Sequence, residues 1–146
     1  MAAESNLWRC TRPRLLAAGY LCQRIETSTG DGVPDVWVGD GDGYAWLENK
    51  AARAWPARAG TPVFGREGLR PEQIAWHLNA ARLRVHAYVW AGVGTGRARQ
   101  TYLIPCKHAG EFNTMARADL ERFVCPIDDL PGRIMLLHCG LPPRRL

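Results

Sequence analysis

Two short apolar runs separated by a glycine-rich segment constrain the fold of this chain most. The first run covers residues 36–38 and the second covers 44–47, and the segment between them alternates glycine with aspartate. Because such residues favour tight turns, we expect an antiparallel hairpin over 36–38 and 44–50. This hairpin places the carboxylate of Asp35 at one end of the motif and Glu48 with Lys50 at the other.

The segment before the hairpin predicts one helix and one strand. Apolar residues recur with a roughly helical period over 4–18, although Pro13 interrupts or bends the pattern. Gly19 is a suitable helix stop. The alternation over 20–25 then predicts a strand.

The second half of the chain predicts further helices and strands. Pro71 suits the first turn of a helix over 71–83. Its apolar stripe is expected to consist of Ile74, Leu78 and Ala81. Further elements are expected as a buried strand over 85–89, a partner strand over 101–104 across the turn 92–96, and a short helix over 116–123.

The order of these elements indicates an α/β domain, with a central mixed sheet flanked by helices. A chain of 146 residues is long enough to bury one hydrophobic core. We place the main domain at 1–125. The proline-containing segment 126–146 is expected to be a tail, draped over the surface or loose.

Composition narrows the cellular setting. No apolar run approaches the length of a membrane span, and the first seven residues lack the layout of a signal peptide. Five widely spaced cysteines indicate reduced thiols, so we expect a cytoplasmic protein with no membrane partner. A net charge of +5 is compatible with a polyanionic partner.

Lysine is rare in this chain, which draws attention to its position in the hairpin. Lys50 and Lys107 are the only lysines among 19 basic residues. Arginine cannot lose its proton near neutral pH, whereas the pKa of a buried lysine can be tuned. A site that needs a lysine would resist replacement by arginine.

Strand geometry makes the acids and the lysine a candidate site. Residues two apart in a strand face the same way, so Glu48 and Lys50 share a side with Trp46. Asp35 is expected to enter from the neighbouring strand. Magnesium takes oxygen ligands, which Asp35, Glu48 and the backbone carbonyl of Asn49 could supply. A lysine beside them can activate a water, and this chemistry suits phosphodiester hydrolysis.

Arginines follow the second strand of the hairpin in an irregular segment over 51–69. Because they come directly after the candidate site, we expect contacts with nucleic-acid phosphates rather than a merely solvated loop. The expected DNA-binding residues are Arg53, Arg58, Arg66 and Arg70.

Three motifs in this order resemble the PD-(D/E)xK nuclease superfamily. They are GVPDVW at 32–37, WLENK at 46–50 and LRPEQIAWH at 69–77. Within the superfamily, the chain looks most like the VRR-NUC branch, found in small phage proteins similar to Holliday junction resolvases. The resemblance covers roughly residues 4–123 and implies a restriction-endonuclease-like fold.

The resemblance implies roles for matching residues. Asp35 and Glu48 correspond to the metal-binding acids and Lys50 to the catalytic lysine. Gln73 corresponds to a glutamine near the active site, on the helix after the catalytic hairpin. Glu4 corresponds to a glutamate of the first helix that often completes the metal site.

Two positions leave the resemblance incomplete. Glu26, at the end of the preceding strand, is a rival to Glu4 as the additional metal ligand. Asn49 stands where the family usually has an apolar residue, although its side chain should face away from the metal.

The implied activity is that of a structure-specific DNA endonuclease that depends on Mg²⁺, with Mn²⁺ as a substitute. Branched DNA, such as a four-way junction, is the expected substrate. A homodimer in a bacterial host or phage-infected cell is also implied. The alternative is a DNA-junction or DNA-end binding protein without catalytic activity. A glycosidase-like carboxylate pair would leave Lys50 and the arginines unexplained.

Overall fold

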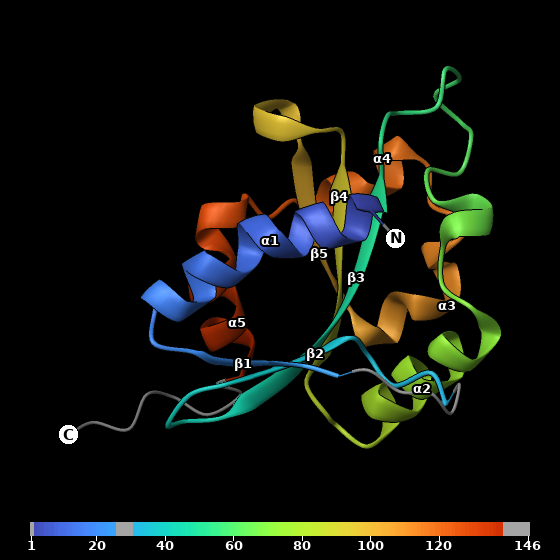
Figure 1. Cartoon of the computed structure of the whole chain (residues 1–146). Helices are drawn as coiled ribbons and strands as arrows, with labels where there is room; N and C mark the ends of the chain where they lie inside the picture. Colours follow the sequence, from blue (N-terminus) through green and yellow to red (C-terminus); the bar gives the residue numbers. More distant parts are fainter. Residues whose placement is uncertain (1, 26–30, 139–146) are drawn as a thin grey trace.

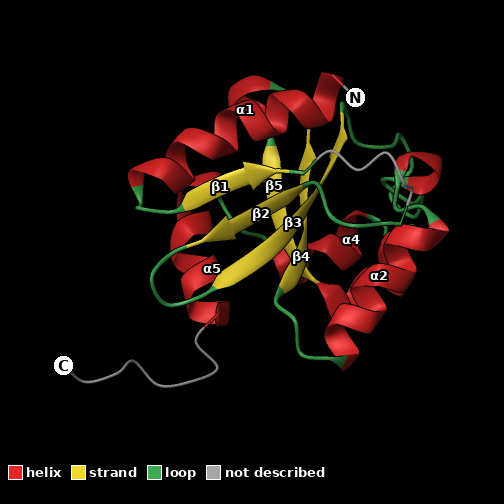
Figure 2. Ribbon diagram, turned by 60° about the horizontal axis from the view of Figure 1, so that its bottom comes forward, coloured by secondary structure: helices red, strands yellow, loops and turns green. Residues whose placement is uncertain are grey.

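A five-stranded mixed sheet forms the centre of the computed structural model, which describes residues 2–25 and 31–138 (Figures 1 and 2). The spatial order of the strands is the same as their order in sequence. The β3–β4 pair is parallel, and the other three pairs are antiparallel. The strands are β1 (Leu21–Arg24), β2 (Val36–Gly39), β3 (Tyr44–Ala52), β4 (Ala87–Val93) and β5 (Gln100–Pro105).

Helices cover both faces of the sheet, so the predicted α/β class is confirmed (Figure 1). In Figure 1, α1 runs across the strands with its N-terminal end beside β3 and α5 lies to their left, whereas α2 and α3 lie to the right. None of the helices within the described ranges is long and apolar enough to cross a membrane. The helices are α1 (Ala2–Ala17), α2 (Pro71–Arg82), α3 (Ala109–Phe112), α4 (Arg117–Leu120) and α5 (Leu130–His138).

A buried threonine fixes α1 to the sheet. The Thr11 hydroxyl donates to the Leu7 carbonyl at 2.8 Å and accepts a hydrogen bond from the Trp90 indole at 2.9 Å. The helix continues through Pro13 and ends at Ala17, and the predicted stop, Gly19, has a φ of 91°, which suits glycine. The Tyr20 amide then bonds to the Leu15 carbonyl, which completes a Schellman motif.

The predicted hairpin is present, and its turn is stabilised by an aspartate. One Asp40 carboxylate oxygen accepts hydrogen bonds from the amides of Asp42 and Gly43, at 2.8 and 3.0 Å. The second strand, β3, extends to Ala52, two residues beyond the predicted end.

Strand β4 is longer than predicted, because Gly92 belongs to the strand rather than to a turn. A Cβ at Gly92 would lie 3.1 Å from side-chain atoms of both Leu7 and Arg99. The glycine therefore allows close packing between α1 and the connection from β4 to β5.

The expectation that the segment from Pro126 is a tail, draped over the surface or loose, is wrong for residues 126–138. This segment forms α5, and Leu130 and Ile134 are fully buried in the cluster that contains Leu7. Pro131 lies in the first turn of α5, where proline is compatible with a helix. The domain boundary at residue 125 stays a prediction.

The inward face of α2 also differs from the prediction. Leu78 of the expected apolar stripe is 42% exposed. The buried residues of this helix are instead Gln73, His77 and Ala80. Ile74 and Ala81, the other two residues of the expected stripe, are half-buried and pack against the core, so only Leu78 departs from the prediction. The buried Gln73 side chain donates to a carboxylate of β3.

Candidate active site

The candidate site lies where β2 stops pairing with β3. Strand β2 begins at Val36, opposite Leu47, so the β3 backbone beyond this point has no β2 partner. Asp35 comes immediately before β2, and its Oδ2 accepts a hydrogen bond from the Asn49 amide at 3.0 Å. This bond fixes the Asp35 carboxylate beside the middle of β3, as the hairpin predicted.

Alternation along β3 separates the functional side chains from the residue between them. Glu48 and Lys50 line a pocket together with Gln73 of α2, whereas Asn49 is not among the residues that line it. Asn49 is buried, and its Oδ1 has no hydrogen-bond partner among the described residues. The use of its backbone carbonyl as a metal ligand stays a prediction.

Gln73 holds Glu48 in place, and both the nitrogen and the oxygen of its side-chain amide form hydrogen bonds. Its Nε2 donates to Glu48 Oε1 at 2.6 Å. Its Oε1 accepts the Arg70 amide at 2.9 Å, so the same side chain caps the first turn of α2. The structure thus brings Gln73 into direct contact with the predicted catalytic acid.

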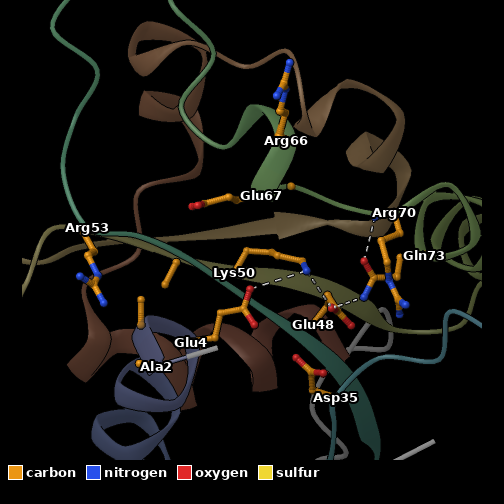
Figure 3. Close-up of a pocket in the computed structure, with 13 residues that line it drawn as sticks. Ala2, Glu4, Asp35, Glu48, Lys50, Arg53, Arg66, Glu67, Arg70 and Gln73 are labelled. Carbon is orange, nitrogen blue, oxygen red and sulfur yellow. Dashed lines mark hydrogen bonds and ion pairs between the residues drawn. The ribbon is translucent and has the colours of Figure 1, made fainter. Parts of the chain in front are cut away.

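The Lys50 ammonium lies between two carboxylates (Figure 3). Its Nζ is 3.5 Å from Glu48 Oε1 and 3.7 Å from Glu4 Oε1. Glu4 belongs to the first turn of α1, so this ion pair joins that helix to β3. The rival acid, Glu26, lies outside the described residues.

Glu48 is the least solvated acid of the site. It is 1% exposed, and its Oε2 has no hydrogen-bond partner among the described residues. Burial is the main cause that raises the pKa of Glu48 to about 8; the neighbouring Asp35 charge also raises it, whereas the Lys50 charge and hydrogen bond lower it. The raised pKa therefore favours a protonated Glu48 when no metal ion is bound.

The pKa of Asp35 is raised as well. Burial raises the pKa of Asp35, while the Asn49 amide and the Lys50 charge lower it. Two neighbouring carboxylates with raised pKa values form a site that a bound cation would stabilise in its ionised state.

A hard divalent cation fits this donor set. It takes carboxylate oxygens and retains several waters, and Asp35 and Glu48 supply two such oxygen ligands. Within residues 2–25 and 31–138, no group of three or more His, Cys, Asp or Glu side chains is arranged to hold a metal. Glu4 as a further ligand stays a prediction, because its carboxylate is placed here beside Lys50.

The pocket around these acids is large and has a basic rim. Its volume is about 920 Å³, and its lining includes Arg53, Arg66 and Arg70 from the segment that follows β3. All three arginines are exposed. In Figure 3, the Arg66 side chain extends away from the carboxylates. We call this the acid–lysine pocket, lined centrally by Glu4, Asp35, Glu48, Lys50 and Gln73.

The fourth predicted DNA-binding arginine lies elsewhere. Arg58 lines a smaller cavity together with Trp55 and Arg117, whose guanidinium lies 4.3 Å from the centre of the Trp55 ring. Its contact with DNA stays a prediction. Glu67, which the sequence did not single out, lines the acid–lysine pocket beside Arg66.

Comparison with known proteins supports the fold. The sequence matches no family model and no curated protein. The structure is similar to that of Hjc from Archaeoglobus fulgidus, a Holliday junction resolvase from an archaeal hyperthermophile, with a TM-score of 0.59 and 17% identity. The match covers 92% of this chain and 99% of that chain. The fold is restriction-endonuclease-like.

Two residues near the site have structural roles in this restriction-endonuclease-like fold. His77 is fully buried, and burial lowers its pKa, so the neutral ring donates from Nδ1 to the Gln73 carbonyl at 2.8 Å. Trp46 packs against Trp76, with ring centroids 5.8 Å apart. Neither residue lines the acid–lysine pocket.

Sequence reasoning missed two residues that position the site. Gly32 has a φ of 73°, and a Cβ there would lie 2.2 Å from the Glu72 carbonyl oxygen. The loop before Asp35 therefore packs directly against the first turn of α2. Asn113 binds both the amide and the carbonyl of Leu69 at 2.7 Å, which fixes the chain before that turn. The positive φ could not be recognised without the fold.

Replacing Gly32 with alanine should lower the free energy of unfolding by about 2 kcal/mol or more, because a positive φ and a backbone clash both oppose a Cβ there. Denaturant unfolding would measure the change. Gly41→Ala is the matched control, since a Cβ at Gly41 meets nothing within 4 Å. Equal stabilities of the two variants would contradict the packing described for Gly32.

Proposed function

We propose that this protein is a metal-dependent DNA endonuclease that cleaves branched DNA. The observation that carries the proposal is the buried Oε2 of Glu48, which has no hydrogen-bond partner among the described residues. Glu48 lines the same pocket as Asp35 and Lys50. Buried polar atoms are rarely left without a partner, so this oxygen calls for a cation, a proton or a water.

Each central side chain has a defined role in this proposal. Asp35 and Glu48 hold Mg²⁺, or Mn²⁺ as a substitute, with Glu4 as the candidate additional acid. When bound, the ion supplies Lewis-acid charge neutralisation at the scissile phosphate and increases the acidity of water. Lys50 orients the attacking water as an ammonium, or deprotonates it as the neutral amine after its own proton has left. Gln73 keeps Glu48 in its orientation through the 2.6 Å hydrogen bond.

The reaction is an in-line hydrolysis. A water oxygen forms a bond to phosphorus while the bond from phosphorus to the 3′-oxygen breaks, and this oxygen leaves with a proton. The products carry a 5′-phosphate and a 3′-hydroxyl. Arg53, Arg66 and Arg70 bind phosphates flanking the cleaved bond, because their exposed guanidinium groups line the same pocket.

Branched DNA is the preferred substrate class in this proposal. Its support is the similarity in fold to a Holliday junction resolvase. Symmetric cleavage of a four-way junction needs two active sites, so we propose a two-fold homodimer. Assignment to the VRR-NUC branch, to phage-related proteins and to the cytoplasm of a bacterial or phage-infected cell rests on the motifs and composition.

A cleavage assay on four-way, three-way, flap and linear DNAs would test this function. The four-way substrate should be cut fastest in Mg²⁺, should also be cut in Mn²⁺, and should remain intact in EDTA. Equal rates on all four DNAs would reject the structure specificity. Absence of cleavage on every DNA, with both metals, would reject the nuclease itself.

A DNA-binding protein without catalytic activity is the rival function. The exposed arginines at the rim of the pocket would serve this function as well. Titration of the protein with Mg²⁺, followed by calorimetry, separates the two. We expect measurable binding that disappears in Glu48→Gln, whereas DNA binding without any metal binding would favour the rival.

A further inference from the structure

A second groove of about 650 Å³ lies between α1 and the connection from β4 to β5. We call it the arginine groove. Figure 1 shows this connection, which contains the short helix η2 (Gly96–Ala98), above α1. The residues that line the groove are Asn6, Arg9, Cys10, Arg14, Thr95, Gly96, Arg97, Arg99, Thr101 and Ile127.

Four arginines line this groove, and one of them, Arg14, is paired with a carboxylate that lies outside the lining. Arg14 is neutralised, because its Nε lies 2.5 Å from Asp128 and its Nη1 donates to the Cys10 carbonyl. Arg9 and Arg97 are exposed, and Arg99 Nε lies 3.5 Å from the Gly94 carbonyl. Among the described residues that line the groove there is no acid. The local charge therefore favours an anion.

The arginine groove and the acid–lysine pocket both lie along α1. Ala2 lines the pocket, and Asn6 and Arg9 line the groove. These residues are spaced by four and three positions, so they form one stripe along the helix. From Ala2 to Arg9 the helix rises about 10 Å, at 1.5 Å per residue.

This distance matches the spacing of a nucleic-acid backbone. Phosphates follow one another at about 3.4 Å along the axis of each strand of duplex DNA, so about 10 Å corresponds to three phosphates. Guanidinium groups on both walls, one from α1 and others from the β4–β5 connection, suit a polyanionic chain that runs between them. Interfaces with proteins typically have an apolar centre, whereas Ile127 is the only large apolar residue among the described residues of this lining.

We propose that the arginine groove binds the sugar–phosphate backbone of the duplex arm that leaves the acid–lysine pocket along α1. The inference rests on the proposed function, which places a DNA strand in that pocket. Arg9 and Arg97 contact phosphates directly. Arg14 is a positioning residue that ties α1 to Asp128.

The test is a salt titration of DNA binding, measured in EDTA so that no cleavage occurs. The variant Arg9→Gln/Arg97→Gln is compared with Arg82→Gln/Arg84→Gln, which removes two exposed arginines from the other face of the sheet. For two lost phosphate contacts, the slope of log K against log salt should become shallower by about 1.8, and affinity at 0.1 M salt should fall by about tenfold or more. The control should retain the wild-type slope and affinity.

Two results would overturn the proposal. One is a wild-type slope and affinity in Arg9→Gln/Arg97→Gln, and the other is an equal loss in the control variant. Melting temperatures close to that of the wild type would show that both variants are folded. Because this experiment measures binding without metal, it stands even if the protein cleaves no DNA. Conversely, a result that rejects the groove as a DNA-binding surface would not change what the cleavage assay tests.

Discussion

Replacing Lys50 with alanine is expected to abolish most DNA cleavage while leaving DNA binding intact. General acid–base catalysis contributes about 10²- to 10⁴-fold to a rate, and a loss in this range is expected for Lys50→Ala. The ammonium lies 3.5 Å from Glu48 and is almost buried, so no other described cation of the pocket occupies its position. Single-turnover cleavage of a four-way junction in Mg²⁺ would measure the rate. A gel-shift assay in EDTA would measure the affinity for the same junction.

The variant Lys50→Arg separates the two roles of the lysine. Arginine keeps the positive charge between Glu4 and Glu48 but does not release a proton near neutral pH. Partial recovery of cleavage would indicate orientation and charge, whereas no recovery would indicate proton transfer. If Lys50→Ala cuts DNA at the wild-type rate, the assigned mechanism is wrong.

Glu48→Gln is expected to abolish cleavage and yet to stabilise the fold at alkaline pH. The pKa of Glu48 is raised from 4.5 to about 8 by burial first, and then by Asp35 and Glu4, with Lys50 acting in the opposite direction. The folded state therefore holds a proton that the unfolded chain has released between these two pH values. Stability from this group is complete below about pH 4.5 and is lost as the pH rises through about 8.

The size of this effect follows from the pKa difference. Each pKa unit corresponds to about 1.4 kcal/mol, so the wild type should lose a few kcal/mol of unfolding free energy over this window through Glu48. Glutamine stays neutral and can still accept the Gln73 hydrogen bond. We expect denaturant unfolding in EDTA to show a higher free energy of unfolding for Glu48→Gln, relative to the wild type, at pH 9 than at pH 5. Identical pH dependence of the two proteins would refute the raised pKa.

Magnesium should reduce the difference in stability between the wild type and Glu48→Gln at alkaline pH. A ligand that binds only the folded state raises its stability, and Glu48 must be ionised to bind the cation. Added Mg²⁺ should therefore raise the melting temperature of the wild type at pH 8, with little effect on Glu48→Gln. The affinity for Mg²⁺ should increase as the pH rises toward 8, because the proton and the cation compete for Glu48.

The central part of the site could be predicted because its geometry is local. Strand alternation alone places Glu48 and Lys50 on one side and Asn49 on the other. The hairpin brings Asp35 beside β3, and the structure adds the hydrogen bond from the Asn49 amide. Gln73 was reached through the family resemblance, and its contact with Glu48 depends on how α2 packs on the sheet.

Features set by distant contacts could not be predicted in this way. The apolar pattern of α2 favoured Leu78 as a core residue, but Leu78 is exposed, and the polar Gln73 is buried through its hydrogen bond with Glu48. The prolines after residue 125 indicated a loose segment, yet Leu130 and Ile134 complete the core against α1. The arginine groove combines residues almost ninety positions apart, such as Arg9 and Arg97, which no local pattern connects.

The most direct test of the nuclease assignment is cleavage of an end-labelled four-way junction by the wild-type protein in Mg²⁺, followed by treatment of the products with DNA ligase. We predict paired nicks on opposing strands, absent in EDTA, with 5′-phosphate and 3′-hydroxyl ends that the ligase reseals. A junction that is bound in the presence of Mg²⁺ but remains uncut would contradict the assignment of Asp35, Glu48 and Lys50 as a nuclease active site.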